Sequence, residues 1–367
     1  MNLYSFIEKY GDFSYLEKDI CEVDILIYSQ LSYLSLLNID FSNDKKYSIE
    51  ELSKLIDQKI TKNYIFAQKK ALDILNTICH KKRFKDALIF NYSYDAIDDM
   101  QFGAITISLP NKKVIVSFEG TDNTIAGWIE DAILSYKYPT PSQVKAGTYL
   151  NELLPKVKGK IIVTGHSKGA NLALVGSMRT NIFKRRKIKS IYSFDGPGLR
   201  KSEFTSFSYK TIRKKLKNIV PSQSLVGVLF HQENLDVIKS TANGIMQHAA
   251  TSWVVEDDHF IRCHQEKISI ELDEVISNWL EKYSDAEKEK IVTNIYSLFE
   301  DANLTKIHDL TDNKIKSIYK LVRSSKIIDN DTKLVIFNCL KVLIGGIGST
   351  IINEEINNLK SKLNFFK

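Results

Sequence analysis

A serine framed by glycines is the clearest chemical signal in this 367-residue sequence. Residues 165–169 read Gly-His-Ser-Lys-Gly, a G-x-S-x-G motif centred on Ser167. The motif follows a run typical of a buried strand, residues 160–164, and precedes a helix-forming run, residues 170–175. A serine on such a turn has strained backbone and an exposed hydroxyl, and the tight packing around it needs glycine on both sides. We therefore interpret Ser167 as a nucleophile. A phosphate-binding turn would need more glycine or a Walker lysine.

A serine nucleophile needs hydrogen-bond donors for the oxyanion that forms when it attacks a carbonyl. The backbone N–H of Lys168, the residue after the serine, is one candidate. The second is Thr121, which follows a predicted strand and Gly120, so that the turn can aim its N–H and its hydroxyl at the carbonyl. An ordinary strand-to-loop turn explains this segment equally well.

In combination, these motifs resemble the class 3 lipase pattern of α/β-hydrolases. The matching residues are Phe118-Glu119-Gly120-Thr121-Asp122, then Gly127-Trp128 and Asp131, then the elbow at residues 163–173. The sequence more closely resembles a bacterial family of uncharacterised lipase-like hydrolases. The residues that carry this second likeness are 194–198, 219–227, Gln247-His248 and Ser252-Trp253. The resemblance implies an α/β-hydrolase fold and a lipid or other acyl-ester substrate, although Glu119 stands where class 3 lipases usually carry arginine.

The general base must be one of seven histidines. In α/β-hydrolases the triad order is serine, acid, histidine, with the histidine after the last strand. His248 lies behind the last predicted strand, residues 235–238, and the Gln-His element of the resembling family agrees with this position. His166 lies inside the elbow, on a turn that points it elsewhere, and we interpret it as a structural donor. The remaining alternatives for the base are His231, His259 and His264.

Three residues are candidates for the acid of the triad. The class 3 pattern has an aspartate before Ile-Val-Pro, where this sequence has Asn218. Asparagine can hold an imidazole tautomer but cannot stabilise imidazolium by charge. Asp195 ends a predicted strand at the carboxyl edge, where active sites of open sheets lie. An Asx turn into the following Gly-Pro-Gly accounts for it equally well. Asp236 is a third option.

Hydrophobic periodicity divides the chain into three zones. Residues 1–85 have apolar residues at helical spacing, which predicts a helical N-terminal segment packed on the core. Residues 86–265 alternate strand-like and helix-length runs, typical of a mostly parallel sheet flanked by helices. Pro110-Asn111-Lys112 predicts a hairpin that adds an antiparallel edge. Residues 266–367 return to the helical period, which predicts a helical C-terminal extension. The predicted strands are 103–109, 113–118, 160–164, 188–194, 216–220 and 235–238.

Composition and charge exclude other classes. The chain is 43% hydrophobic and 26% charged, which excludes disorder. Four widely spaced cysteines give no disulfide framework, and the N-terminus lacks a signal-peptide pattern, so we expect a cytoplasmic protein. The longest apolar stretch, residues 334–352, contains Asn, Lys and three Gly, so we expect a buried helix ended by glycines rather than a membrane span.

The net charge of +7 is concentrated in one segment. Residues 179–217 hold thirteen Lys/Arg and two Asp/Glu, a net charge of +11, whereas the rest of the chain sums to −4. If Ser167 lies at one end of its strand, the following helix carries this basic segment to the opposite edge, where cations complement helix C-termini. The segment is therefore a candidate docking site for an anionic surface or a protein partner, and specific nucleic-acid binding is not expected.

The sequence thus predicts a serine hydrolase that cleaves an acyl ester and needs no metal or organic cofactor. Ser167 attacks the carbonyl, His248 is the general base, and Thr121 and Lys168 stabilise the oxyanion. Two rival interpretations stay open. One is a catalytically weak or inactive hydrolase-fold module for binding or assembly, which Asn218 and Glu119 favour. The other is a lipase-type effector that acts on membranes.

Overall fold

A computed structural model describes most of the chain. The described residues are 1–56, 66–97, 100–121, 132–301, 312–325, 328–343 and 350–363. Four residues of the predicted lipase pattern, Asp122, Gly127, Trp128 and Asp131, lie outside these ranges.

An eight-stranded sheet runs through the molecule, with its strands in sequential order from β1 to β8. Its strands are β1 (Lys46–Ser48), β2 (Leu88–Ile97), β3 (Met100–Ser108), β4 (Val114–Phe118), β5 (Ile161–His166), β6 (Ile188–Phe194), β7 (Leu216–Pro221) and β8 (Leu235–Ile238). The strands from β4 to β8 are parallel, as predicted. The predicted hairpin joins β3 to β4, but the antiparallel edge is wider than that hairpin, because β2 and β1 extend it. A separate two-stranded sheet pairs β9 (Val255–Glu256) with β10 (His259–Phe260).

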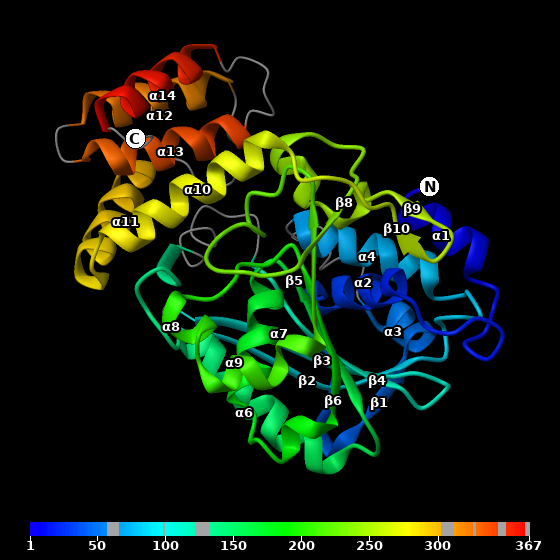
Figure 1. Cartoon of the computed structure of the whole chain (residues 1–367). Helices are drawn as coiled ribbons and strands as arrows, with labels where there is room; N and C mark the ends of the chain where they lie inside the picture. The colour runs from blue at the N-terminus through cyan, green and yellow to red at the C-terminus, as the bar shows by residue number, and fades with distance from the viewer. Residues whose placement is uncertain are drawn as a thin grey trace.

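Helices cover both faces of the sheet, and the helices on the two faces come from different parts of the chain (Figure 1). On one face lie the helices that connect successive parallel strands: α6 (Pro141–Lys156), α7 (Lys168–Arg179), α8 (Lys201–Phe204) and α9 (Phe207–Ile212). The other face is covered by the N-terminal helices: α1 (Leu3–Tyr10), α2 (Glu22–Gln30), α3 (Ile49–Leu55) and α4 (Phe66–Ile78). Successive residues of a strand point to opposite faces. Accordingly, Val114 and Val116 belong to the apolar cluster under α6 and α7, whereas Ile115 belongs to the cluster under the N-terminal helices.

A buried ion pair fixes the N-terminal helices. The Arg83 guanidinium and the Asp24 carboxylate are both fully buried, and Arg83 Nε donates to Asp24 Oδ1 over 2.7 Å. The same guanidinium donates to the backbone carbonyls of Lys18 and Asp19, each over 2.9 Å. Removing one partner of such a pair leaves an uncompensated buried charge, so this contact ties α2 to the stretch that follows α4 within the N-terminal segment.

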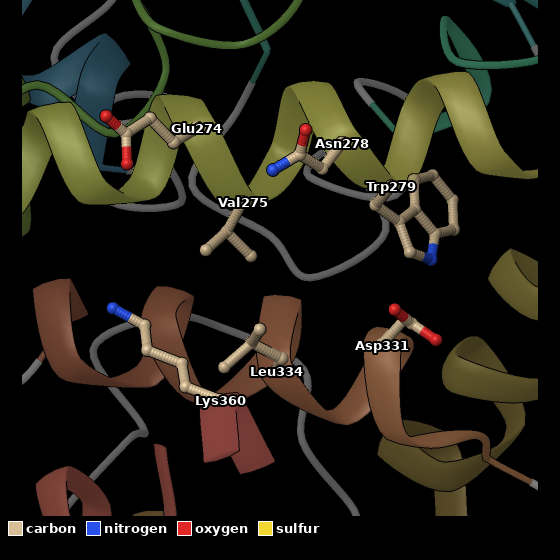
Figure 2. Close-up of a pocket in the computed structure, with 7 residues that line it drawn as sticks. All are labelled: Glu274, Val275, Asn278, Trp279, Asp331, Leu334 and Lys360. Carbon is tan, nitrogen blue, oxygen red and sulfur yellow. The ribbon is translucent and has the colours of Figure 1, made fainter. Parts of the chain in front are cut away.

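The C-terminal extension is helical and packs on the core through α10 and α13. Its helices are α10 (Lys267–Lys282), α11 (Asp285–Asp301), α12 (Asp312–Ser324), α13 (Asn330–Leu343) and α14 (Thr350–Leu363). One apolar cluster joins α10 and α13 to the loop that contains Leu225 and Val226. Figure 2 shows a pocket lined by residues of α10, α13 and α14, including Trp279 and Leu334. In the ranges that the structure describes, no helix is long and apolar enough to cross a membrane. The glycines predicted to end α13 lie outside those ranges.

Candidate active site

The G-x-S-x-G motif forms the sharp turn between β5 and α7. Ser167 has φ 58° and ψ −135°, a left-handed conformation that costs energy for any residue with a side chain. Its N–H donates to the Phe194 carbonyl over 2.9 Å, which ties the turn to β6. A Cβ at Gly165 would lie 2.2 Å from the backbone of Gly169, and one at Gly169 would lie 2.2 Å from the Phe118 carbonyl oxygen. Gly165 is therefore required for the turn to close on the start of α7, and Gly169 is required for it to pack against β4.

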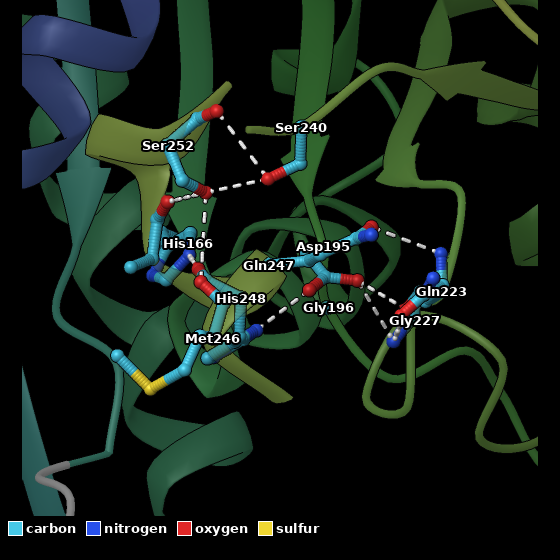
Figure 3. A network of polar contacts seen from close by, with 12 residues as sticks. His166, Asp195, Gly196, Gln223, Gly227, Ser240, Met246, Gln247, His248 and Ser252 are labelled. Atoms are coloured by element: carbon cyan, nitrogen blue, oxygen red, sulfur yellow. Dashed lines mark hydrogen bonds and ion pairs between the residues drawn. The ribbon is translucent and has the colours of Figure 1, made fainter. Parts of the chain in front are cut away.

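A buried carboxylate holds the imidazole of His248. Asp195 follows β6 directly, is fully buried, and accepts a hydrogen bond from His248 Nδ1 at Oδ2 over 2.6 Å (Figure 3). Its other oxygen accepts from the Gly227 N–H over 3.1 Å and from the Ser224 hydroxyl. Because the carboxylate accepts at Nδ1, the ring carries its proton there and Nε2 is left as the acceptor. This is the protonation pattern that a general base needs.

The loop that carries His248 is clamped by its neighbours. His248 ends the short helix η6 (Gly244–His248), which follows β8. The side chain of Gln247 accepts from the Gln223 N–H over 3.0 Å, and the Gln247 carbonyl accepts from Trp253 Nε1 over 2.7 Å. Trp253 is fully buried. The Gln-His and Ser-Trp elements noted in the sequence therefore hold His248 in place.

His166 connects the elbow to the loop of His248. Its Nε2 lies 2.9 Å from the His248 carbonyl oxygen, and its Nδ1 lies 3.0 Å from the Tyr33 hydroxyl. A carbonyl can only accept, so Nε2 carries the proton and Nδ1 accepts from Tyr33. Burial, reinforced by the nearby His248 ring, lowers the pKa of His166 to about 3. His166 is thus a neutral donor, in agreement with its interpretation from the sequence.

Tyr33 is the site residue that sequence reasoning missed. It lies in the short helix η1 (Leu31–Tyr33) of the N-terminal segment, and its hydroxyl also lies 3.3 Å from the His166 carbonyl oxygen. A Cβ at Gly120 would come within 2.1 Å of that hydroxyl. Tyr33 therefore fills the space between the elbow and the end of β4. Local sequence carries no signal of this contact, because 133 residues separate Tyr33 from its partner.

The two predicted oxyanion donors lie at the ends of β4 and β5. Thr121 is buried, and its hydroxyl oxygen has no hydrogen-bond partner among the described residues. Lys168 is also buried, and its Nζ donates to the Gln101 carbonyl over 3.1 Å. Its backbone N–H belongs to the first turn of α7, where N–H groups have no partner within the helix. Helix N-termini favour negative charge, so this end of α7 suits a developing oxyanion.

The other candidate acids have different partners. Asn218 lies within β7, where its Nδ2 donates to the Glu233 carbonyl over 3.1 Å. Its Oδ1 is buried without a partner in the described part of the chain. Asp236 pairs with Arg262 through a 2.7 Å hydrogen bond from Nε. Asp195 is therefore the acid that contacts His248.

The alternative bases are placed elsewhere. His231 forms a backbone bridge with Leu199, His259 is half exposed beside Asp258, and His264 is exposed. Among the residues that the structure describes, no group of three or more His, Cys, Asp or Glu side chains could hold a metal ion.

The sequential sheet, its crossover helices and the serine on a strained strand-to-helix turn define an α/β-hydrolase fold, which confirms the predicted fold class. The chain belongs to the Mbeg1-like family, a lipase-like family whose model matches residues 78–297. This match confirms the predicted membership of a lipase-like family. Family and fold are those of lipase-type hydrolases.

Solved lipase structures are similar at low identity. The M37 lipase has 17% sequence identity and a TM-score of 0.36, over 56% of this chain and 68% of that chain. The native Rhizomucor miehei lipase propeptide complex has 18% identity and a TM-score of 0.35, over 59% of this chain and 67% of that chain. No curated protein matches this sequence. The family assignment therefore rests on the family model.

Proposed function

We propose that this protein is a serine hydrolase that cleaves an acyl ester with the triad Ser167, His248 and Asp195. The observation that carries the proposal is the 2.6 Å hydrogen bond from His248 Nδ1 to the fully buried Asp195. The next residue, Gly196, packs so closely on the strained Ser167 that a Cβ there would lie 2.7 Å from the Ser167 carbonyl oxygen. Strain and burial of charge both cost stability, and a site that retains both is a candidate for catalysis.

The reaction follows from the roles of these atoms. Ser167 Oγ attacks the ester carbonyl while His248 Nε2 takes its proton, and Asp195 stabilises the imidazolium that results. The carbonyl oxygen becomes an oxyanion, for which the Lys168 N–H and Thr121 are the proposed donors. The intermediate expels the alcohol, which receives the proton from His248. A water molecule, deprotonated by His248, then attacks the acyl-enzyme and releases the carboxylic acid and Ser167.

The finer assignments are proposals that rest on the sequence. The F-E-G-T and G-H-S-K-G motifs support a relationship to class 3 lipases and, more narrowly, to bacterial lipase-like hydrolases, with a lipid or other acyl ester as substrate. The four cysteines are free, which supports a reducing compartment such as the cytoplasm.

Labelling with a fluorophosphonate probe tests the proposal. We expect the folded wild-type protein to gain the mass of one adduct and the Ser167→Ala variant to gain none. Hydrolysis of a p-nitrophenyl ester should fall about 10⁴-fold or more in Ser167→Ala. Ser202→Ala, which alters an exposed serine on α8, should label and hydrolyse like the wild type.

An unlabelled wild type, or an equal adduct on Ser167→Ala, would overturn the enzymatic role. Either result would favour the alternative of a non-catalytic hydrolase-fold module.

A further inference from the structure

The amino-terminal edge of the parallel strands carries the two ends of the basic segment, residues 179–189 and 210–217, and some of their cations serve the fold. Lys187 Nζ donates to the carbonyls of Leu154 and Val157 at the end of α6, over 2.7 and 2.8 Å. Arg185 donates to the Thr180 carbonyl just after α7, over 2.8 Å. These side chains satisfy helix C-termini, as cations in the last turn commonly do.

A second set of cations on the same edge points to solvent. Its exposed members are Lys156, Lys158, Lys160, Arg186, Lys189, Lys210 and Lys214. The two acidic residues between positions 179 and 217 do not offset them. Asp195 is buried in the active site, and Glu203 lies 4.0 Å from Arg200. Exposed cations therefore outnumber the acidic side chains here, even when Asp19, Glu152 and Glu233 from other elements are counted.

Two phenylalanines are exposed close in sequence to these cations, Phe183 just before Lys184 and Phe207 three residues before Lys210. Phe183 is 72% exposed and Phe207 is 69% exposed, the largest exposed fractions of any phenylalanine in the described ranges. Ile182, beside Phe183, is 45% exposed. The Arg186 guanidinium lies 6.0 Å from the centre of the Phe183 ring. Apolar side chains of this size are normally buried, so their gathering within a basic surface indicates a binding face.

Arg185 ties the two aromatic positions together. Its Nη1 donates to the Thr211 hydroxyl over 2.5 Å and lies 3.5 Å from the Ser208 carbonyl. Arg185 is two residues from Phe183, and Ser208 follows Phe207 at the start of α9. The two stretches that carry the rings are therefore held together, and we call their exposed surface the Phe183–Phe207 face.

We propose that the Phe183–Phe207 face docks on the surface of an anionic lipid membrane. The two rings and Ile182 would enter the boundary between headgroups and acyl chains, and the surrounding lysines and arginine would pair with anionic headgroups. Four to eight clustered Lys/Arg beside exposed aromatic residues are the features that bind such surfaces. Duplex DNA would pair with the cations, but its stacked bases offer no partner to the two phenylalanine rings.

The fold determines which way the enzyme would face. Ser167 precedes the first residue of α7, whereas the basic edge begins after Arg179, at its end. Twelve helical residues rise about 18 Å. A protein docked by the Phe183–Phe207 face would therefore direct Ser167 away from that lipid surface. The membrane would localise the protein rather than supply its substrate, which distinguishes this proposal from an effector that attacks the membrane it binds.

Co-sedimentation with vesicles tests this inference. We expect wild-type protein to sediment with vesicles that contain phosphatidylglycerol and phosphatidylcholine but not with vesicles of phosphatidylcholine alone. The sedimented fraction should fall as the salt concentration rises. Lys210→Gln and Lys214→Gln should each weaken binding about 5-fold. The double variant Phe183→Ser, Phe207→Ser should weaken it about 10-fold or more. Leu16→Ser and Lys267→Gln, which alter exposed residues elsewhere, should bind like the wild type.

Three results would overturn the inference. They are absence of vesicle binding, equal vesicle binding by the double phenylalanine variant, and preference for duplex DNA over vesicles at the same salt concentration. Fluorophosphonate labelling separates this inference from the proposed hydrolase activity. It should be unchanged in the double variant, and vesicles should not accelerate it. Acceleration by vesicles would contradict the proposed orientation.

Discussion

The two ends of α7 use the same helix dipole in opposite ways. At its amino end, the first-turn N–H groups follow Ser167, where two glycines and the neutral His166 form a buried site. At its carboxyl end, Arg185 donates to the carbonyls of Met178 and Thr180. The positive end thus lies at the candidate site, next to Ser167, whereas the negative end is neutralised by a fixed cation. A dipole aimed at charge that develops only during a reaction assists catalysis, whereas one neutralised in the resting protein assists stability.

The largest expected effect lies at the amino end. Asp195→Asn should leave the fold intact and lower kcat about 10⁴-fold, because an amide no longer selects the Nδ1 proton of His248 or stabilises its charge. Steady-state hydrolysis of a p-nitrophenyl ester measures the change, with circular dichroism as the check on folding. Asp236→Asn, which alters the other candidate aspartate, should retain wild-type kcat. Wild-type activity in Asp195→Asn would assign the acid to another residue. It would also contradict the proposal that the amino end of α7 serves catalysis through this triad.

The parallel strands were predictable because each is a short apolar run next to turn residues. The bounds of β6 and β8 equal the predicted ones, and the ends of β4 and β5 differ from the predicted ones by one or two residues. β1 and β2 were not predicted. β1 is only three residues long, and β2 alternates apolar with polar side chains and contains a bulge between Phe90 and Ser93. Pairing with β3 defines these strands more than their local sequence does.

Only part of the candidate site could be predicted from short stretches of sequence. The elbow around Ser167 is specified by five consecutive residues between a strand-like and a helix-forming run, so this local sequence predicts its geometry. The choice between Asp195 and Asn218 was open because it depends on the paths of two loops. Ser224 and Gly227, which fold back onto the Asp195 carboxylate, settle that geometry. Contacts of this kind join distant positions and leave no spacing signal in a single sequence.

At the carboxyl end of α7 we expect a loss of stability without a loss of activity. Arg185→Ala should lower the free energy of unfolding by about 2–3 kcal/mol, because it leaves the carbonyls of Met178 and Thr180 without their donor. Denaturant unfolding measures this change, and kcat should match the wild type. The exposed neighbour supplies the control, since Arg186→Ala should change stability by less than about 0.5 kcal/mol. A fall in kcat for Arg185→Ala would mean that the two ends of α7 are coupled.

The smallest expected effect is the pH dependence of stability that comes from the neutral His166 at the amino end of α7. The unfolded chain protonates His166 near pH 6.5, whereas burial lowers the pKa in the folded protein to about 3. Between these values the unfolded state binds the extra proton, so this group's contribution to stability is present above pH 6.5 and is lost as pH falls. Going from pH 7 to pH 5 should cost about 2 kcal/mol at this residue.

Urea unfolding at the two pH values, compared between the wild type and His166→Asn, isolates that contribution. The variant is expected to be less stable at pH 7, because it loses the contacts to Tyr33 and His248, but its stability should depend less on pH. His259→Asn, which alters a half-exposed histidine on β10, should keep the pH dependence of the wild type. If His166→Asn keeps that dependence as well, His166 takes up its proton as readily in the folded protein as in the unfolded chain. The amino end of α7 would then carry a charge of its own in mild acid, and the contrast between its two ends would hold only near neutral pH.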